Sequence, residues 1–164
     1  MKKIKMWPAL LTLCLFFAGF QTPAASAKGI RWRPVEEGML MAKEENKKIM
    51  MHYYTDWCGY CTKMNQETFP DPGIISYLNR RYISIRVDND KTRVKGFVVP
   101  GVPDTWFLTE TGEKIAHQPG FVDSKKLLSI LKFVDTESYL KMSFMDFLKK
   151  ERAEKKKPGK KAGK

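Results

Sequence analysis

Two cysteines three residues apart, Cys58 and Cys61, limit the folds open to this chain more than any other feature. They follow an apolar run, Lys48–Tyr54, that is typical of a buried strand, and they open a stretch with helical character. Free backbone N–H groups and the positive end of the dipole at a helix N-terminus stabilise a thiolate, the nucleophilic form of sulfur. Cys61 lies one helical turn further on, where it can close a small disulfide ring. The pattern therefore favours reversible dithiol–disulfide exchange over structural cross-linking.

The first residues have the composition of a secretory signal. Three lysines in the first five residues precede an apolar stretch, Ala9–Phe20, and Ala25-Ser26-Ala27 gives the small-residue pattern of a cleavage site. The apolar stretch is about a dozen residues, whereas a membrane-spanning helix needs about 20. We therefore predict a signal peptide over 1–27 and export to the periplasm or beyond the cell after cleavage near Ala27. An uncleaved N-terminal anchor is the alternative.

Removal of the signal changes the number of cysteines. Cys14 lies inside the apolar stretch, so only Cys58 and Cys61 remain in the mature chain. Exported proteins usually use even sets of cysteines as disulfide staples, but a staple across so short a ring stabilises little. The cysteine count thus favours a redox role for the pair.

The positive charge is concentrated at the two ends of the chain. The formal net charge is +12, of which 1–27 carries +3 and 149–164 carries +7, which leaves about +2 for the domain predicted over 28–148. A nearly neutral body argues against a nucleic-acid partner. The tail over 149–164 is expected to be disordered, with Pro158 ending any helix. This tail is either only solvated, or it attracts the protein to an anionic membrane surface or an acidic partner.

The periodicity of the remaining chain predicts alternating helices and strands. The expected helices are Pro34–Lys47, 58–68, Ile74–Arg81, one capped by Asp123 and one opening at Ser143. The expected strands are Lys48–Tyr54, Tyr82–Val87, Thr105–Thr109 and Lys114–His117, the last two forming a hairpin. A strand–helix–strand unit followed by a hairpin implies an α/β fold with a mixed sheet covered by helices.

Five segments of the chain resemble thioredoxin-fold proteins, and two of them, 68–72 and 120–123, match the bacterial disulfide reductase in particular. The matching residues are 53–61 around the cysteines, 99–103 ending in Gly-Val-Pro, the strand 105–109 with Gly112 in its turn, 68–72, and 120–123. Within this group the chain is most similar to the C-terminal periplasmic domain of the bacterial transmembrane disulfide reductase. The resemblance covers roughly 47–133. It implies a thioredoxin-like fold with a central mixed sheet flanked by helices, to which this chain adds a C-terminal helix and a basic tail.

The resemblance also implies roles for individual residues. Cys58 would attack a substrate disulfide, and Cys61 would resolve the mixed disulfide. Pro103 matches the family's cis-proline, and the backbone of Val102 before it would pair with the substrate chain. Trp57 and Tyr60 would contact the substrate beside Cys58, although simple packing is the alternative for Trp57.

The direction of exchange stays open at this stage. Gly59-Tyr60 lies between the cysteines, where the dipeptide influences thiolate stability. This dipeptide resembles that of the periplasmic disulfide isomerase rather than that of thioredoxin, yet the chain has no room for the isomerase's separate dimerisation domain.

Two positions depart from the family pattern. His52 stands where thioredoxins and the reductase domain have a buried Asp that moves protons for the resolving cysteine, and Asn65 stands where the reductase domain has an acid. A neutral imidazole behind Cys61 could accept the thiol proton. A packed, hydrogen-bonded core histidine without that role is the alternative.

Three functions are therefore compared. The first is a protein-disulfide reductase or isomerase that needs no cofactor and acts as a monomer. Its partners would be protein thiols and disulfides and an upstream electron donor, for which a membrane disulfide reductase is a candidate. The second is a metal-binding module using Cys58 and Cys61 with His52 and His117. The third is a non-enzymatic adaptor, which would have no need of a paired thiol.

Overall fold

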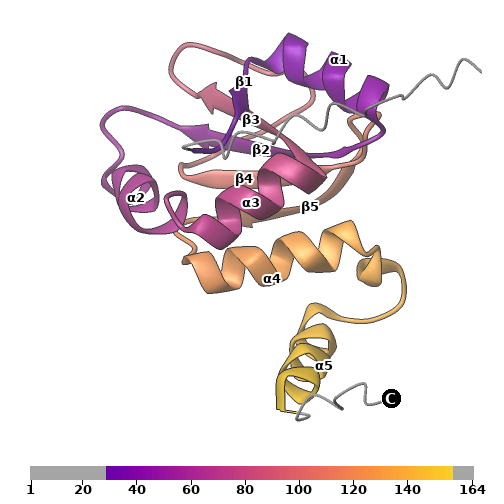
Figure 1. Ribbon diagram of the computed structural model, residues 1–164. Helices are drawn as coiled ribbons and strands as arrows, with labels where there is room; N and C mark the ends of the chain where they lie inside the picture. Colours follow the sequence, from indigo (N-terminus) through magenta and orange to yellow (C-terminus); the bar gives the residue numbers. More distant parts are fainter. Residues whose placement is uncertain (1–28, 157–164) are drawn as a thin grey trace, which may run out of the picture.

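The computed structural model describes residues 29–156. The predicted signal peptide over 1–27 and the end of the predicted tail, 157–164, lie outside the described residues. The described chain forms a central sheet with helices on both faces and one further helix, α5, that extends away from the sheet beneath α4 (Figure 1).

The sheet has five strands in the order β1-β3-β2-β4-β5. β1 and β2 both run parallel to β3, whereas β4 is antiparallel to both β2 and β5. The strands are β1 (Trp32–Arg33), β2 (Lys48–Tyr54), β3 (Tyr82–Asp88), β4 (Asp104–Leu108) and β5 (Lys114–Pro119). This is the mixed sheet that the order of elements predicted.

The helices divide between the two faces. α1 covers one face, and α3 and α4 lie on the other (Figure 1). The helical segments are α1 (Val35–Glu45), α2 (Gly59–Lys63), α3 (Pro72–Arg81), α4 (Ser124–Asp135) and α5 (Phe144–Lys156), with a π-helical turn over Met64–Thr68 and a 3-10 turn over Ser138–Leu140. Asp71 and Asp123 cap α3 and α4 by accepting backbone N–H groups through their side chains.

Each face of the sheet has its own apolar core, because successive residues of a strand point to opposite sides. On the α3–α4 face, Met50 and Phe107 pack against Leu78 and Leu131. On the α1 face, Met51 and Ile85 pack against Ala42. β2 therefore contributes to both cores, and five of its seven residues are buried.

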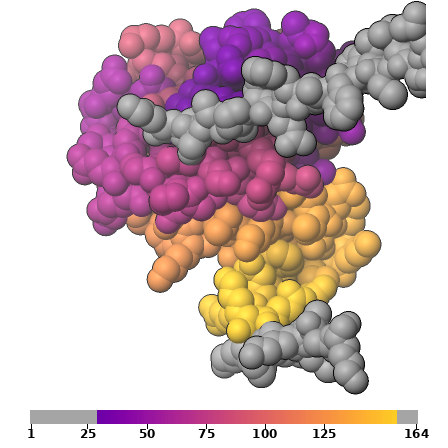
Figure 2. Space-filling model, in the orientation of Figure 1, coloured from indigo at the N-terminus to yellow at the C-terminus, as the bar shows by residue number. Residues whose placement is uncertain are grey.

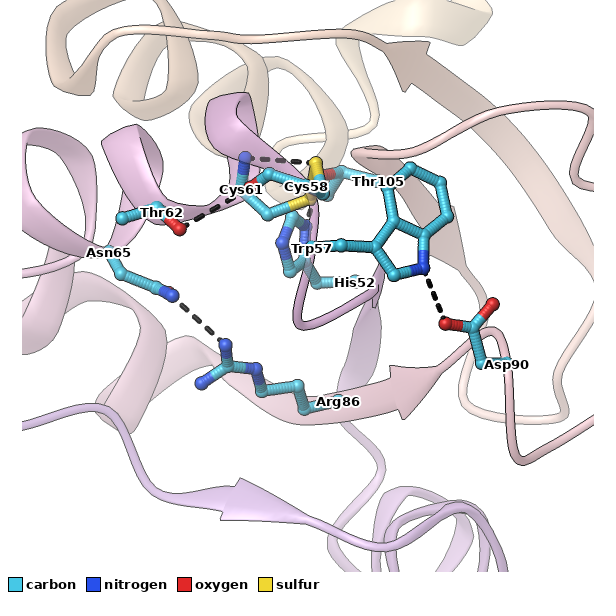
Figure 3. The surroundings of a disulfide bond; sticks show 9 residues. All are labelled: His52, Trp57, Cys58, Cys61, Thr62, Asn65, Arg86, Asp90 and Thr105. Atoms are coloured by element: carbon cyan, nitrogen blue, oxygen red, sulfur yellow. Dashed lines mark hydrogen bonds between the residues drawn. A yellow bond between two sulfur atoms is a disulfide. The ribbon is translucent and has the colours of Figure 1, made fainter.

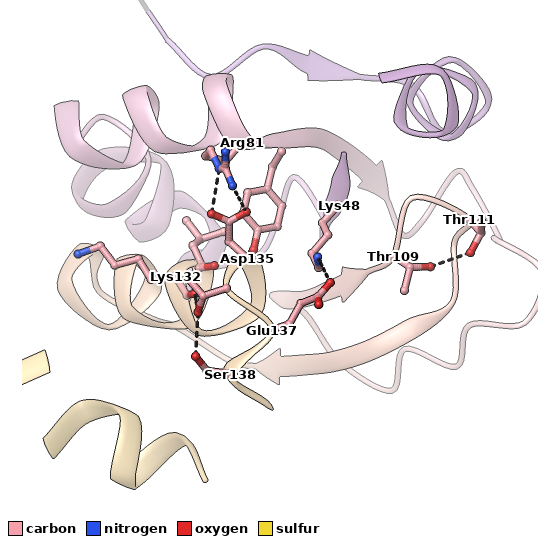
Figure 4. A network of polar contacts seen from close by, with 11 residues as sticks. Lys48, Arg81, Thr109, Thr111, Lys132, Asp135, Glu137 and Ser138 are labelled. Carbon is pink, nitrogen blue, oxygen red and sulfur yellow. Dashed lines mark hydrogen bonds and ion pairs between the residues drawn. The ribbon is translucent and has the colours of Figure 1, made fainter. Parts of the chain in front are cut away.

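Polar contacts fix the end of the fold where α3 and α4 finish. Asp135 at the end of α4 accepts two hydrogen bonds from the Arg81 guanidinium (Figure 4). It accepts a third from the Tyr77 hydroxyl. Lys48 at the start of β2 pairs with Glu137 at 2.9 Å. These contacts hold α4 against α3 and β2.

The structure differs from the predicted elements at three places. β1 was not predicted, because two residues are too few to show an alternating pattern. The helix after the cysteines widens into a π turn, marked by the Phe69 N–H to Met64 O bond at 2.9 Å. α5 continues through Lys156, eight residues beyond the domain end that we drew at Leu148. Figure 2 shows this last helix protruding from the body of the molecule.

α5 is attached to α4 by a small set of contacts. The Phe133 ring lies 5.3 Å from both the Phe144 and the Phe147 rings. Glu151 accepts hydrogen bonds from Ser129 at 2.8 Å and from Lys132 at 3.1 Å. The predicted C-terminal helix is therefore present, and it packs on the outside of the domain.

Gly38 lets α1 lie close to the sheet, which gives a test of this packing. A Cβ at position 38 would lie 2.4 Å from Cγ1 of Ile85, so Gly38→Val should overpack the α1 face and lower the free energy of unfolding by about 1–3 kcal/mol. Urea unfolding measures this change. Gly29→Val is the control, because no atom lies within 4 Å of a Cβ there. Equal stability of the two variants would contradict the close α1–β3 packing.

Candidate active site

The two cysteines lie at the end of the central strand. β2 ends at Tyr54, and Cys58 is the N-cap of α2, where its sulfur accepts the Cys61 backbone N–H at 3.1 Å (Figure 3). The cysteines form a disulfide with a Cα–Cα distance of 5.2 Å. Cys58 is 5% exposed and Cys61 1%, so Cys58 is the more accessible of the two. An N-cap sulfur that accepts a helical N–H has the surroundings that stabilise a thiolate.

Two aromatic side chains stand exposed beside the disulfide. Trp57 is 74% exposed and Tyr60 65%. The Trp57 indole donates to Asp90 at 2.7 Å, which ties the cysteine loop to the turn after β3 (Figure 3). Tyr60 lies 6.4 Å from the Phe121 ring. Trp57 is therefore mostly exposed and tied to Asp90, and its contact with a substrate stays a prediction.

Val102 and Pro103 lie at the same end of the sheet as the cysteines. The Val102–Pro103 peptide bond is cis, as the resemblance implied. Pro103 directly precedes β4, whose first residue, Asp104, pairs with Tyr53 near the end of β2. The Pro103 carbonyl accepts the Gly120 N–H at 2.7 Å, which holds this loop against the segment after β5.

His52 is fully buried in β2 and points toward the Cys61 side of the disulfide (Figure 3). Its Nδ1 lies 2.9 Å from the Thr105 hydroxyl, and its ring centroid lies 4.9 Å from that of Phe69. Among the described residues, Nε2 has no hydrogen-bond partner. Burial, and secondly the nearby Arg86 cation, lower the pKa of His52 from 6.5 to about 3.

The lowered pKa keeps His52 neutral at physiological pH. The hydrogen bond to Thr105 matches the packed core histidine of our second alternative, while a part in proton transfer stays a prediction. Asn65, the other position that departs from the family pattern, accepts a hydrogen bond from Arg86 at 3.3 Å (Figure 3). No carboxylate of the described residues is hydrogen-bonded to His52, so its surroundings differ from those of a buried Asp.

The four residues of the proposed metal module do not come together. His117 lies across from Trp106, stacks on it at 4.4 Å and approaches Asp104 at 3.2 Å. His52 instead contacts Thr105, and because successive β4 residues alternate, the two histidines lie on opposite faces of the sheet. Within 29–156 no group of three or more His, Cys, Asp or Glu side chains could hold a metal ion.

Three residues around the site were not predicted from the sequence. Thr105 contacts His52, Asp90 holds Trp57, and the Arg86 guanidinium lies 4.0 Å from the Tyr54 ring centroid. No motif marks Thr105 or Asp90. Arg86 could have been found, because a charged residue inside the apolar alternation of β3 is unusual for a buried strand.

Comparisons with known proteins agree with this geometry. The family model described as a thioredoxin-like domain matches residues 35–135. The thiol:disulfide interchange protein DsbD of Photorhabdus laumondii is 28% identical over 102 residues, which cover 58% of this chain and 17% of that protein. A second DsbD, from Vibrio vulnificus, is matched over 20% of its length, so the chain spans about a fifth of these relatives.

Solved structures show the same fold. A thioredoxin from Thermus thermophilus superimposes with a TM-score of 0.59 at 26% identity, covering 65% of this chain and 87% of that chain. The oxidised C-terminal domain of DsbD from Neisseria meningitidis gives a TM-score of 0.50 at 22% identity, covering 59% and 90%. At that identity the second likeness concerns the fold alone.

The chain therefore belongs to the thioredoxin-like domain family, and its paired cysteines place it with that family's disulfide oxidoreductases. The predicted similarity to the reductase's C-terminal domain is confirmed. From residue 29 to residue 156, none of the helices is long and apolar enough to cross a membrane.

His52 gives this protein a specific pH dependence of stability. Its pKa is about 3 in the folded chain against 6.5 without the shift, so between these values the unfolded chain binds more protons and stability falls as the pH falls. From pH 7.5 to pH 5, His52 should account for a loss of about 1–2 kcal/mol. Urea unfolding of the wild type and of His52→Gln at both pH values measures this contribution. An equal pH dependence in the two proteins would contradict it.

Proposed function

We propose that this protein is an exported thiol–disulfide oxidoreductase that reduces or isomerises disulfides of envelope proteins. The observation that carries the proposal is the Cys58–Cys61 disulfide at the start of α2, on the same end of the sheet as the cis Val102–Pro103 bond. The signal-like composition of residues 1–27 supports export. Similarity to thiol:disulfide interchange proteins supports the reaction class.

The reaction begins with the pair in its reduced form. The Cys58 thiolate attacks one sulfur of a substrate disulfide, which forms a Cys58–substrate disulfide and releases the other substrate sulfur as a thiolate. Cys61, after losing its proton, attacks the Cys58 sulfur. This step forms the Cys58–Cys61 disulfide and releases the second substrate thiol. Two electrons pass from the cysteine pair to the substrate, so a dithiol donor must reduce the pair again.

The surroundings of Cys58 are suited to a polypeptide substrate. Trp57 and Tyr60 provide exposed apolar surface on either side of Cys58. Val102 precedes the cis-proline, where its backbone groups are proposed to pair with an extended substrate segment. The partners are then protein thiols and disulfides, together with an upstream dithiol donor, for which a membrane disulfide reductase is the candidate. The protein is proposed to act as a monomer.

Trapping of mixed disulfides tests this function. In Cys61→Ser the resolving step is lost, so disulfide-linked complexes through Cys58 should accumulate in the periplasmic fraction of expressing cells and disappear on reduction. Non-reducing electrophoresis followed by mass spectrometry detects them. Cys58→Ser is the matched control and should trap nothing. If Cys61→Ser forms no complexes, or if cellular activity survives Cys58→Ser, the proposal fails and the adaptor alternative is favoured.

We also propose that the C-terminal segment attracts the protein weakly to anionic lipid. α5 carries exposed cations at Lys149, Lys150 and Arg152, and exposed apolar side chains lie nearby at Leu140 (68%) and Met145 (63%). Cations near an anionic surface each contribute about 1 kcal/mol to binding. Replacement of the three cations by Gln should therefore weaken binding to phosphatidylglycerol vesicles markedly, as measured by co-sedimentation at low and high salt.

The matched control replaces three exposed lysines elsewhere, Lys95, Lys125 and Lys126, by Gln. This variant has the same net charge as the α5 variant. If both variants lose binding equally, the attraction follows net charge rather than α5, and if neither loses it, the segment has no role in lipid binding.

A further inference from the structure

The two residues that open β4 each contact one of the chain's two histidines. Asp104 approaches His117 on the α1 face, and Thr105 contacts His52 on the α3–α4 face. His52 and Thr105 are also directly opposed across the β2–β4 ladder, and both are fully buried. Thr105 follows the cis-proline by two residues, so one short segment carries Pro103 and the partner of His52.

Among the described residues, only one of the two ring nitrogens of His52 has a hydrogen-bond partner. The Nδ1–Thr105 distance of 2.9 Å is a normal hydrogen bond. Nε2 has no such hydrogen bond to a described residue. The ring centroids of Phe69 and Trp32 lie 4.9 and 6.2 Å from the imidazole centroid. A buried polar atom without a partner is unfavourable, so a hydrogen-bond donor placed beside Nε2 would be stabilising.

Reduction of the disulfide provides the missing donor. When the S–S bond breaks, two electrons and two protons convert the sulfurs into thiols. Cys61 is 1% exposed, and burial favours the neutral thiol over the charged thiolate. Figure 3 shows the imidazole pointing toward this cysteine. A thiol S–H is a weak hydrogen-bond donor that an imidazole nitrogen lone pair can accept.

We propose that Thr105 is a positioning residue that accepts the Nδ1–H of His52 and so holds the Nε2 lone pair toward Cys61, where it accepts a hydrogen bond from the thiol in the reduced protein. This assignment rests on the proposed function, because it concerns the redox cycle of the same pair. The opposite tautomer would direct a buried N–H at Cys61 and could not accept the S–H bond. Thr105 thereby stabilises the dithiol relative to the disulfide.

The equilibrium of the pair with glutathione tests the assignment. Thr105→Val keeps the shape of the side chain but removes its hydroxyl, and it should shift the equilibrium about tenfold toward the disulfide, or about 30 mV toward a more negative potential. Thr105→Ser retains a hydroxyl and should stay within about twofold of the wild type. Urea unfolding of each variant shows whether it is folded under the conditions of the measurement.

Nitrogen NMR of the wild type provides a second readout that does not depend on a variant. The ¹⁵N shifts of His52 should report a protonated Nδ1 in both redox states, with the Nε2 shift changing on reduction as it gains the Cys61 hydrogen bond. A protonated Nε2 in the reduced protein would overturn the assignment, as would an unchanged equilibrium in folded Thr105→Val. A wild-type pair that does not exchange with glutathione at all would instead refute the proposed function.

Discussion

The pairing of β2 with β4 is the constraint on which the site depends. β2 is the middle strand of five and contributes side chains to both cores, so its position is fixed from both faces. Its antiparallel neighbour begins immediately after Pro103. The ladder therefore places the cis-proline segment, which is distant in sequence, at the same end of the sheet as Cys58. Without that register the cysteines would still form a ring, but they would lack the neighbouring cis-proline segment and the partner of His52.

Much of this arrangement could be predicted from the sequence, because it depends on local patterns. The alternation in Tyr82–Val87, the turn around Gly112 and the cap at Asp123 each depend on a few consecutive residues, and each is found in the structure. The cysteine pair could likewise be placed at a helix N-terminus. The resemblance to thioredoxin-fold proteins added the cis-proline, which physical reasoning alone gives only a small chance.

The rest depends on contacts that no local pattern records. The partner of His52 is 53 residues away, and the partner of Trp57 is 33 residues away. Burial and the nearby Arg86 cation lower the pKa of His52, and the residue type alone does not reveal this shift. The π turn over Met64–Thr68 also escaped prediction, since its composition differs little from that of an α-helix. Sequence reasoning thus identified the reactive groups, whereas the structure was needed for the groups that surround them.

The attachment of α5 bears on where this domain can be cut. The family match ends at residue 135, yet Phe133 packs against two aromatic rings of α5, and Ser129 and Lys132 both bind Glu151. A recombinant fragment ending at the family boundary would leave this side of α4 uncovered and expose an aromatic side chain to solvent. The smallest fragment with a complete surface on α4 therefore ends beyond Glu151, and expression trials should choose their boundaries accordingly.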